Sequence, residues 1–439
     1  MSSTTAAVRP PAGSRTRGSR TPPRELLTWV RVQGDNTERH LAALRPFTRA
    51  EFGAGPEAPT EGHVQAANEL IDLLRGNLQT HARRLHTAVT AATNVPVAVR
   101  LREVVGHKQN AHTAATRAEQ IWDFYFELFG MRQSRFGPWL LGCDRIALDC
   151  YQYAYLGLGR ARSIPAPPAF SYMRTGFSPA TFRRGIPLRR LGRQLNPFPL
   201  IQLPYHRLVN PWTLGAILHE VSHNLQNDLG LARAVPLAIA DRLTGAGLRP
   251  EVVAVWLRWH RETFADLAGL LLGGPAVAAS LMDVIGRGHR AVSDFSPRSP
   301  HPTPYLRVFL SVELLRRLGL TADAALTRQI WTRLYPRPVP GAIPAAVLSS
   351  FAEAHRLVVD AICFTPYAPL GNRTLARTLR FEAKEQQMIE EAARRLAAGN
   401  DPGVVPERFL IGAARFALDR RLAAPELITT NFYRELARR

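Results

Sequence analysis

The sequence predicts a mainly α-helical protein with a small β element. Apolar residues recur at spacings of three and four along much of the 439-residue chain, which is typical of amphipathic helices. Only short pieces favour β-strand, and PLIQLPYHRL is the best of them. Because 46% of the residues are hydrophobic, the chain can build a sizeable core. The clearest helical patterns are ELIDLLRGNLQTHARRLHTAV (69–89), EQIWDFYFELFG (119–130) and FEAKEQQMIEEAARRLAAG (381–399).

Composition and proline-rich breaks divide the chain into four parts. Residues 1–24 contain arginines but no apolar run, so a disordered basic tail is predicted. Residues 25–165 are expected to form an α-helical N-terminal domain that ends at the stretch SIPAPPAF. The functional site is expected in a domain of residues 166–319, and residues 320–439 in a further helical region. After the short β pieces, helices are predicted at 211–229, 251–272, 275–287 and 305–318.

Cysteine content and hydropathy indicate the kind of environment that suits the chain. The three cysteines, Cys143, Cys150 and Cys363, are an odd number and form no CxxC pair, so neither a disulfide framework nor a cysteine-based metal site is indicated, and a reducing compartment fits best. The N-terminus lacks the apolar core of a signal peptide, and the apolar run 267–282 is short and interrupted by Gly and Pro. We therefore expect a soluble, cytoplasmic protein without an integral membrane segment, with non-classical export as an alternative. The sequence does not predict the oligomeric state.

The positive charge is concentrated in one segment. The formal net charge is +21, and residues 151–218 contain no Asp or Glu at all. Such a basic segment, taken as residues 160–207, could face an acidic partner such as nucleic acid, an anionic membrane surface or an acidic peptide. A solvated face whose arginines pair with distant carboxylates is the simpler interpretation, because no nucleic-acid-binding motif accompanies the charge. The segment's arginines are Arg160, Arg162, Arg174, Arg183, Arg184, Arg189, Arg190, Arg193 and Arg207.

The stretch HEVSH (219–223) is the strongest functional motif in the chain. Asn210 followed by Pro211 predicts a helix start, and Gly230 predicts its end, so the motif lies in mid-helix. Residues four apart share a helix face, so His219 and His223 can present two imidazoles to one metal ion. A neighbouring glutamate could then accept the proton of a metal-bound water.

A third ligand would distinguish a metal site from two unrelated histidines. Neither the Gly nor the third His of the HExxHxxGxxH pattern is present, which excludes the metzincin subclass. The predicted helix 251–272 supplies Glu262, and Asp266 follows one turn later, where it could fix the tautomer of a ligating imidazole. Burying two acids among Trp256, Trp259 and Phe264 would be costly unless they are paired or bind a metal.

These motifs resemble those of a known family. Glu262-Thr-Phe-Ala-Asp266 is similar to the ExxAD segment of gluzincin metallopeptidases related to CAAX prenyl proteases and HtpX-type heat-shock proteases, and His301-Pro-Thr-Pro-Tyr-Leu-Arg307 is similar to their HPxxxxR segment. The resemblance covers residues 210–319 and implies a zincin-like core flanked by helical regions. It implies that His219, His223 and Glu262 bind zinc, that Glu220 is the general base, that Asp266 supports the ligands, and that His301 and Arg307 line the site. His301, Tyr305, His289 and Arg307 stay as alternatives for the group that stabilises the oxyanion.

The function implied by this resemblance is zinc-dependent peptide hydrolysis, in which Glu220 activates a zinc-bound water against a peptide or protein substrate. The His₂Glu set favours zinc, although cobalt or manganese could occupy it. The strand PLIQLP is expected at a sheet edge, where it could align the substrate. Two alternatives stay open. One is a non-catalytic zincin-like scaffold that binds a nucleic acid or an acidic protein through its Arg-rich surface. The other is a latent or exported protease.

Overall fold

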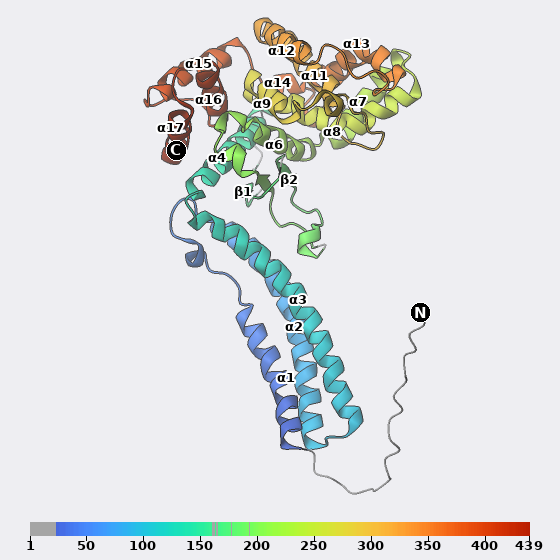
Figure 1. The fold of residues 1–439 in the computed structure, drawn as a ribbon, viewed down its shortest axis with the longest axis vertical. Coiled ribbons are helices and arrows are strands. Elements are labelled where there is room, and N and C mark those ends of the chain that lie inside the picture. The colour runs from blue at the N-terminus through green and yellow to red at the C-terminus, as the bar shows by residue number, and fades with distance from the viewer. Residues whose placement is uncertain (1–22, 160–162, 164–165, 177, 193) are drawn as a thin grey trace, which may run out of the picture. The chain divides into compact units, whose positions relative to one another are not determined.

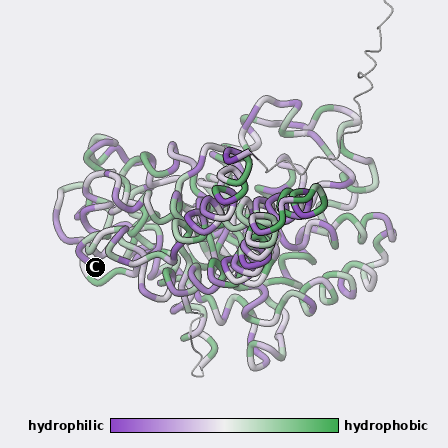
Figure 2. The backbone as a smooth tube through the Cα atoms, turned by 90° about the horizontal axis from the view of Figure 1, so that it is seen from below, coloured by the Kyte–Doolittle hydropathy of each residue, from purple (hydrophilic) through white to green (hydrophobic). Residues whose placement is uncertain are grey.

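Helices form most of the computed structural model, which describes residues 23–159, 163, 166–176, 178–192 and 194–439 (Figure 1). This confirms a mainly α-helical protein with a small β element. In Figure 2, hydrophobic and hydrophilic stretches alternate along the helices, as expected if each helix buries one face. The predicted disordered tail lies outside the described residues apart from its last two positions, and the first helix begins at Arg24.

The chain divides into two compact units. The first comprises residues 1–46 and 71–122, and the second comprises residues 47–70 and 123–439. In the first unit, α1 (Arg24–Ala43) packs beside α2 (Glu61–Asn94) and α3 (Ala98–Gly130) within those residue limits (Figure 1). Their shared core contains Val30, Leu85 and Val104, and Glu38 pairs with His86 at 3.3 Å. No residue predicted to act in catalysis belongs to this unit.

Helices form most of the second unit. Its longer helices are α4 (Gly137–Gly157), α6 (Gly215–Asp228), α7 (Leu231–Gly245), α8 (Pro250–Gly273), α9 (Pro275–Ile285), α11 (Pro304–Arg317), α12 (Thr321–Leu334), α13 (Ala345–Val359), α15 (Ala383–Ala397), α16 (Phe409–Asp419) and α17 (Pro425–Arg438). Its shorter ones are α5 (Tyr205–Leu208), α10 (His289–Ser293) and α14 (Leu375–Thr378). One hydrophobic core extends from Leu140 to Leu436. No helix in the described part of the chain is long and apolar enough to cross a membrane.

The expected domain boundaries at 165/166 and 319/320 both fall inside the second unit. Buried ion pairs and apolar contacts tie the flanking helices to the centre. Arg408, just before α16, pairs with Asp149 of α4 at 2.9 Å and donates to the carbonyl of Leu272 in α8. Helices on either side of residues 166–319 therefore share one core with that segment. All three cysteines are buried as free thiols in this core, so they form no disulfide with one another.

The sheet has three strands in the order β1-β3-β2, namely β1 (Phe170–Met173), β3 (Leu200–Leu203) and β2 (Ala180–Phe182). β1 pairs with β3 in parallel, and β2 pairs with β3 antiparallel, with Ser171 and Thr181 both opposite Ile201. The expectation that PLIQLP forms an edge strand is wrong, because β3 lies in the centre of the sheet. Pro204 does not interrupt the ladder, since β3 has already ended at Leu203 and α5 begins at Tyr205.

The helix of the HEVSH motif begins later than expected. Asn210 and Pro211 start a short 3₁₀ turn, and α6 itself begins at Gly215. The side chain of Asn210 does not cap this turn but donates to the carbonyl of His206. Gly230 ends the helix as expected, with a positive φ of 75° that also starts α7. The motif consequently sits near the middle of α6.

Candidate metal centre

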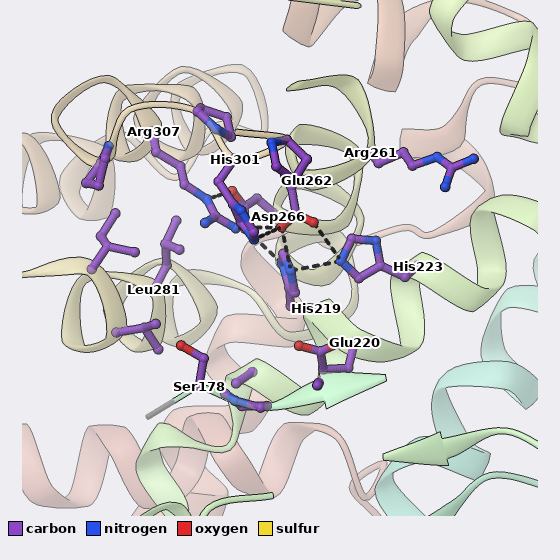
Figure 3. Close-up of a pocket in the computed structure, with 18 of the residues that line it drawn as sticks. Ser178, His219, Glu220, His223, Arg261, Glu262, Asp266, Leu281, His301 and Arg307 are labelled. Carbon is purple, nitrogen blue, oxygen red and sulfur yellow. Dashed lines mark hydrogen bonds and ion pairs between the residues drawn. The ribbon is translucent and has the colours of Figure 1, made fainter. Parts of the chain in front are cut away.

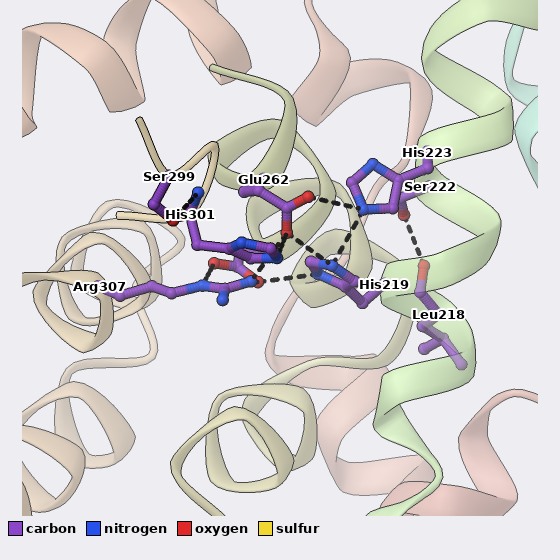
Figure 4. Close-up of polar contacts among 9 residues, drawn as sticks. Leu218, His219, Ser222, His223, Glu262, Ser299, His301 and Arg307 are labelled. Atoms are coloured by element: carbon purple, nitrogen blue, oxygen red, sulfur yellow. Dashed lines mark hydrogen bonds and ion pairs between the residues drawn. The ribbon is translucent and has the colours of Figure 1, made fainter. Parts of the chain in front are cut away.

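His219 and His223 lie on the same face of α6, as their spacing of four predicts. Their Nε2 atoms are 3.1 Å apart, and both side chains are about one-sixth exposed (Figure 4). The opposite face of the helix is apolar, with Val221 and Leu225 fully buried. The two imidazoles therefore lie fixed at the inner end of an accessible cavity.

Glu262 on α8 completes a group of three ligands. Its carboxylate oxygens lie 3.4 Å from Nε2 of His219 and 3.4 Å from Nε2 of His223 (Figure 4). One donor atom from each residue falls within 4.8 Å of the other two. Two nitrogens and one oxygen that converge in this way could hold a metal ion.

A glycine explains why the two helices approach closely at this point. A Cβ atom built on Gly269 of α8 would lie 3.2 Å from the backbone nitrogen of His219. Few side chains could replace hydrogen at this crossing without moving the backbone of α6. The crossing therefore brings the ligands of α6 within reach of Glu262, two turns earlier in α8.

Asp266 and Arg307 fix the ligands from behind. Asp266 accepts from Nδ1 of His219 at 2.9 Å, so that in the neutral imidazole the proton lies on Nδ1 and the lone pair on Nε2. Arg307 of α11 donates to both oxygens of Asp266, from Nε at 2.5 Å and from Nη2 at 2.9 Å, and from Nη2 to Glu262 at 3.4 Å (Figure 3). The guanidinium of Arg307 is nearly buried, so it holds both acids in place.

Glu220 faces the same cavity from the neighbouring position on α6 (Figure 3). Its carboxylate is buried and accepts from the backbone N–H of Thr181 in β2. Burial raises the pKa of Glu220 to about 7, against the opposing charge of His219. Asn224 donates to the Thr181 hydroxyl at 3.2 Å, which anchors β2 alongside α6.

The charges of the cluster suit a cation. Three carboxylates, those of Glu220, Glu262 and Asp266, face the single guanidinium of Arg307. Burial lowers the pKa of His219, but its hydrogen bonds to Asp266 and Glu262 outweigh that effect and raise it to about 10. Burial and the charge of His219 lower the pKa of His223 to about 3. The acids thus stabilise positive charge between them, and a divalent ion at the three ligands would supply it.

The site opens into a cavity of about 820 Å³. β2 and the following residue form one wall, α9 forms another, and the loop before α11 forms a third. β2 is an edge strand, so the strand beside the site is the one that sequence analysis did not select. Sequence analysis also missed the cavity residues Thr181, Arg261 and Leu281, and it named Arg183 only as a member of the Arg-rich segment.

The four candidates for an oxyanion-stabilising group lie in different places. His301 lines the cavity, with Nε2 3.3 Å from Glu262 and its side chain 56% exposed. Arg307 also lines it, but its guanidinium is held by Asp266. Tyr305 and His289 are not among the described residues that line the cavity, because Tyr305 packs against Phe309 and His289 contacts the carbonyl of Arg337. Of the four, His301 alone has an accessible imidazole beside the three candidate ligands.

The described arginines of the Arg-rich segment differ in their exposure. Arg174, Arg184 and Arg189 are exposed, whereas Arg207 is only 4% exposed. Arg183 is half-buried and lines the cavity. Arg160, Arg162, Arg193 and the side chain of Arg190 lie outside the described part of the structure.

Comparisons of the chain with models of protein families, with curated proteins and with solved structures found no match. The function is therefore inferred from the geometry of the site.

Proposed function

We propose that this protein is a zinc-dependent metallopeptidase of the gluzincin type, with a zincin-like core made by β2, α6 and α8. The observation that carries the proposal is the convergence of His219, His223 and Glu262 in one cavity that Glu220 also lines. A structural metal site would not need a second carboxylate facing the same open space. A hydrolytic site does need one, because a general base must lie beside the attacking water.

The ligands fit zinc by their chemistry, since two imidazole nitrogens and one carboxylate oxygen are a donor set found in zinc hydrolases. His219, His223 and Glu262 would hold the ion, with Asp266 fixing His219. A bound zinc ion would lower the pKa of a water molecule and polarise the scissile carbonyl.

The side chains of this chain have separate roles in the proposed reaction. Glu220 takes a proton from the water that adds to the carbonyl carbon, and returns it to the amine when the C–N bond breaks. His301 donates to the oxygen that gains negative charge, from the exposed position that it occupies beside Glu262. Arg307 is a positioning residue, because it acts through Asp266 and Glu262.

Hydrolysis of a mixture of fluorogenic peptides tests the proposal. The zinc-loaded protein should cleave, EDTA should stop cleavage, and added zinc should restore it. Glu220→Gln should retain the metal and lose about 10²- to 10⁴-fold in rate, which is the usual contribution of a general base. Equal rates for wild type and Glu220→Gln would contradict the proposal, as would no cleavage by the metal-loaded protein.

A second candidate function is a non-catalytic scaffold that binds an acidic partner. The exposed side chains of Arg174, Arg184 and Arg189 favour it. It predicts that Glu220→Gln leaves binding of nucleic acid or acidic protein intact, whereas charge reversals at Arg183, Arg184, Arg189 and Arg190 abolish it. The peptidase proposal predicts instead that Glu220→Gln abolishes function and that the charge reversals have a smaller effect.

A further inference from the structure

The two sides of the cavity differ in chemistry. On one side, α9 contributes the apolar side chains Val277, Leu281 and Val284. On the other side stand the guanidinium groups of Arg183 and Arg261. Figure 3 shows Leu281 and Arg261 on opposite sides of the metal-binding group. A peptide that crosses the group would place its two halves in different surroundings.

Both arginines are available to a ligand. Neither guanidinium forms a hydrogen bond or an ion pair with any residue that the structure describes, although the charge of Asp228 raises the pKa of Arg183. Burial lowers the pKa of Arg183, and the nearby charge of Arg261 lowers it further, so the two cations repel each other. A carboxylate between them would relieve this repulsion and replace the lost hydration of Arg183.

The rest of the cavity rim does not cancel this charge. Asp294 is the one carboxylate among the described lining residues outside the group of Glu220, Glu262 and Asp266. Arg261 is adjacent to the ligand Glu262, and Arg183 follows directly on β2. The positive charge therefore belongs to the wall of the same cavity and not to a remote surface.

We propose that the cavity selects peptides with an acidic side chain on the Arg183 and Arg261 side of the cleaved bond, and an apolar side chain on the α9 side. This specificity rests on the proposed hydrolytic function. A charge pair between a substrate carboxylate and a partly desolvated guanidinium distinguishes Glu from Lys at one position, since the wrong charge is repelled as well as unpaired. The apolar side chains of α9 favour an apolar substrate residue, so enrichment of acidic residues is expected on one side of the cleaved bond only.

The test is digestion of a mixture of synthetic random peptides by the zinc-loaded full-length protein, with cleavage positions read by mass spectrometry. Acidic residues should be enriched roughly tenfold over basic ones at a fixed position on one side of the cut. Arg183→Glu and Arg261→Glu should remove or invert that ratio. Arg189→Glu is the matched control, because Arg189 is an exposed arginine of the same segment that does not line the cavity. The ratio within each variant is compared, so a general loss of activity does not affect the readout.

A binding measurement separates this inference from the proposed function. Glu220→Gln is titrated into fluorescein-labelled peptides that differ only by Glu or Lys, and anisotropy is recorded. The inferred selectivity is overturned if cleavage occurs without acidic enrichment, or if the enrichment is unchanged in both Arg183→Glu and Arg261→Glu. Either result would leave the proposed hydrolysis intact. If the protein prefers the Glu peptide, the preference depends on Arg183 and no cleavage occurs, then the selectivity is supported and the proposed hydrolysis is overturned. If the protein shows neither cleavage nor preferential binding, both the inferred selectivity and the proposed hydrolysis are overturned.

Discussion

His219 is the residue on which the site's geometry depends most. Its Nε2 faces the other ligands, and its Nδ1 is held by Asp266, which is itself held by Arg307. The chain of contacts joins α6, α8 and α11, so the orientation of one imidazole is determined by three helices. A change in this chain of contacts should therefore change the metal affinity of the site.

Asp266→Asn should weaken zinc binding about 10- to 100-fold, because the amide neither fixes the Nδ1 tautomer as firmly nor raises the basicity of the imidazole. Competition with a zinc-binding dye measures the affinity. Asp241→Asn is the control, since Asp241 is an exposed acid on the neighbouring helix α7. An unchanged affinity in Asp266→Asn would show that Asp266 does not act on the ligand.

Helical periodicity predicted which residues share a face within each helix, whereas the grouping of residues from two helices came from the resemblance to known motifs. His219 and His223 share a face of α6, and Glu262 and Asp266 share a face of α8. Sequence reasoning failed at Tyr305, which is two residues from Arg307. Successive helix positions differ by about 100° in direction, and packing decided which one faces the cavity.

At the scale of elements, the site is the crossing point of α6 and α8. The near contact between Gly269 and the backbone of His219 sets the separation of the two helices. Glycine costs helix stability in such a position, by about 1 kcal/mol relative to alanine. Close approach at the ligands is the structural reason for glycine here.

Gly269→Leu should push α6 away from α8 and abolish tight zinc binding, while lowering the free energy of unfolding by about 1–3 kcal/mol through overpacking. Metal titration and urea unfolding measure the two effects. Gly245→Leu is the control, because a Cβ atom at Gly245 meets no other group within 4 Å. Zinc affinity close to wild type in Gly269→Leu would mean that this crossing does not position the ligands.

The strand beside the site could not be chosen from sequence. β2 is three residues long and carries no alternation that distinguishes it from the surrounding loop. β3 has the stronger apolar pattern because it is buried in the middle of the sheet, with Leu200, Ile201 and Leu203 fully buried. A strong strand signal therefore marked the centre of the sheet, whereas the weaker strand lies at the site.

At the scale of the molecule, all of the proposed ligands belong to the second unit, while α1 and most of α2 and α3 form the first. The predicted boundaries near 165 and 319 both lie inside the second unit, in which helices on either side of them share one core. Contacts such as Arg408 with Asp149, which are 259 positions apart, leave no local trace in the sequence.

Metal removal should therefore act on one unit. Metal binding stabilises the native state by about 4 kcal/mol at a free metal concentration 1,000 times Kd. This stabilisation is expected only in the segments that carry or contact the ligands. With EDTA, amide hydrogen exchange should rise in α6 and α8 and stay unchanged in residues 71–122. Glu220→Gln should respond like wild type, because it keeps the ligands. A uniform change along the chain, or none, would contradict a site confined to the second unit.

The central claim is that His219, His223 and Glu262 hold one metal ion. Metal content by mass spectrometry, on wild type, Glu220→Gln and Glu262→Ala purified in parallel, tests it most directly. Wild type and Glu220→Gln should each contain about one zinc per chain, because a site of this kind binds one ion, whereas Glu262→Ala should lose most of its zinc. Absence of stoichiometric metal from all three proteins, or full retention in Glu262→Ala, would contradict it.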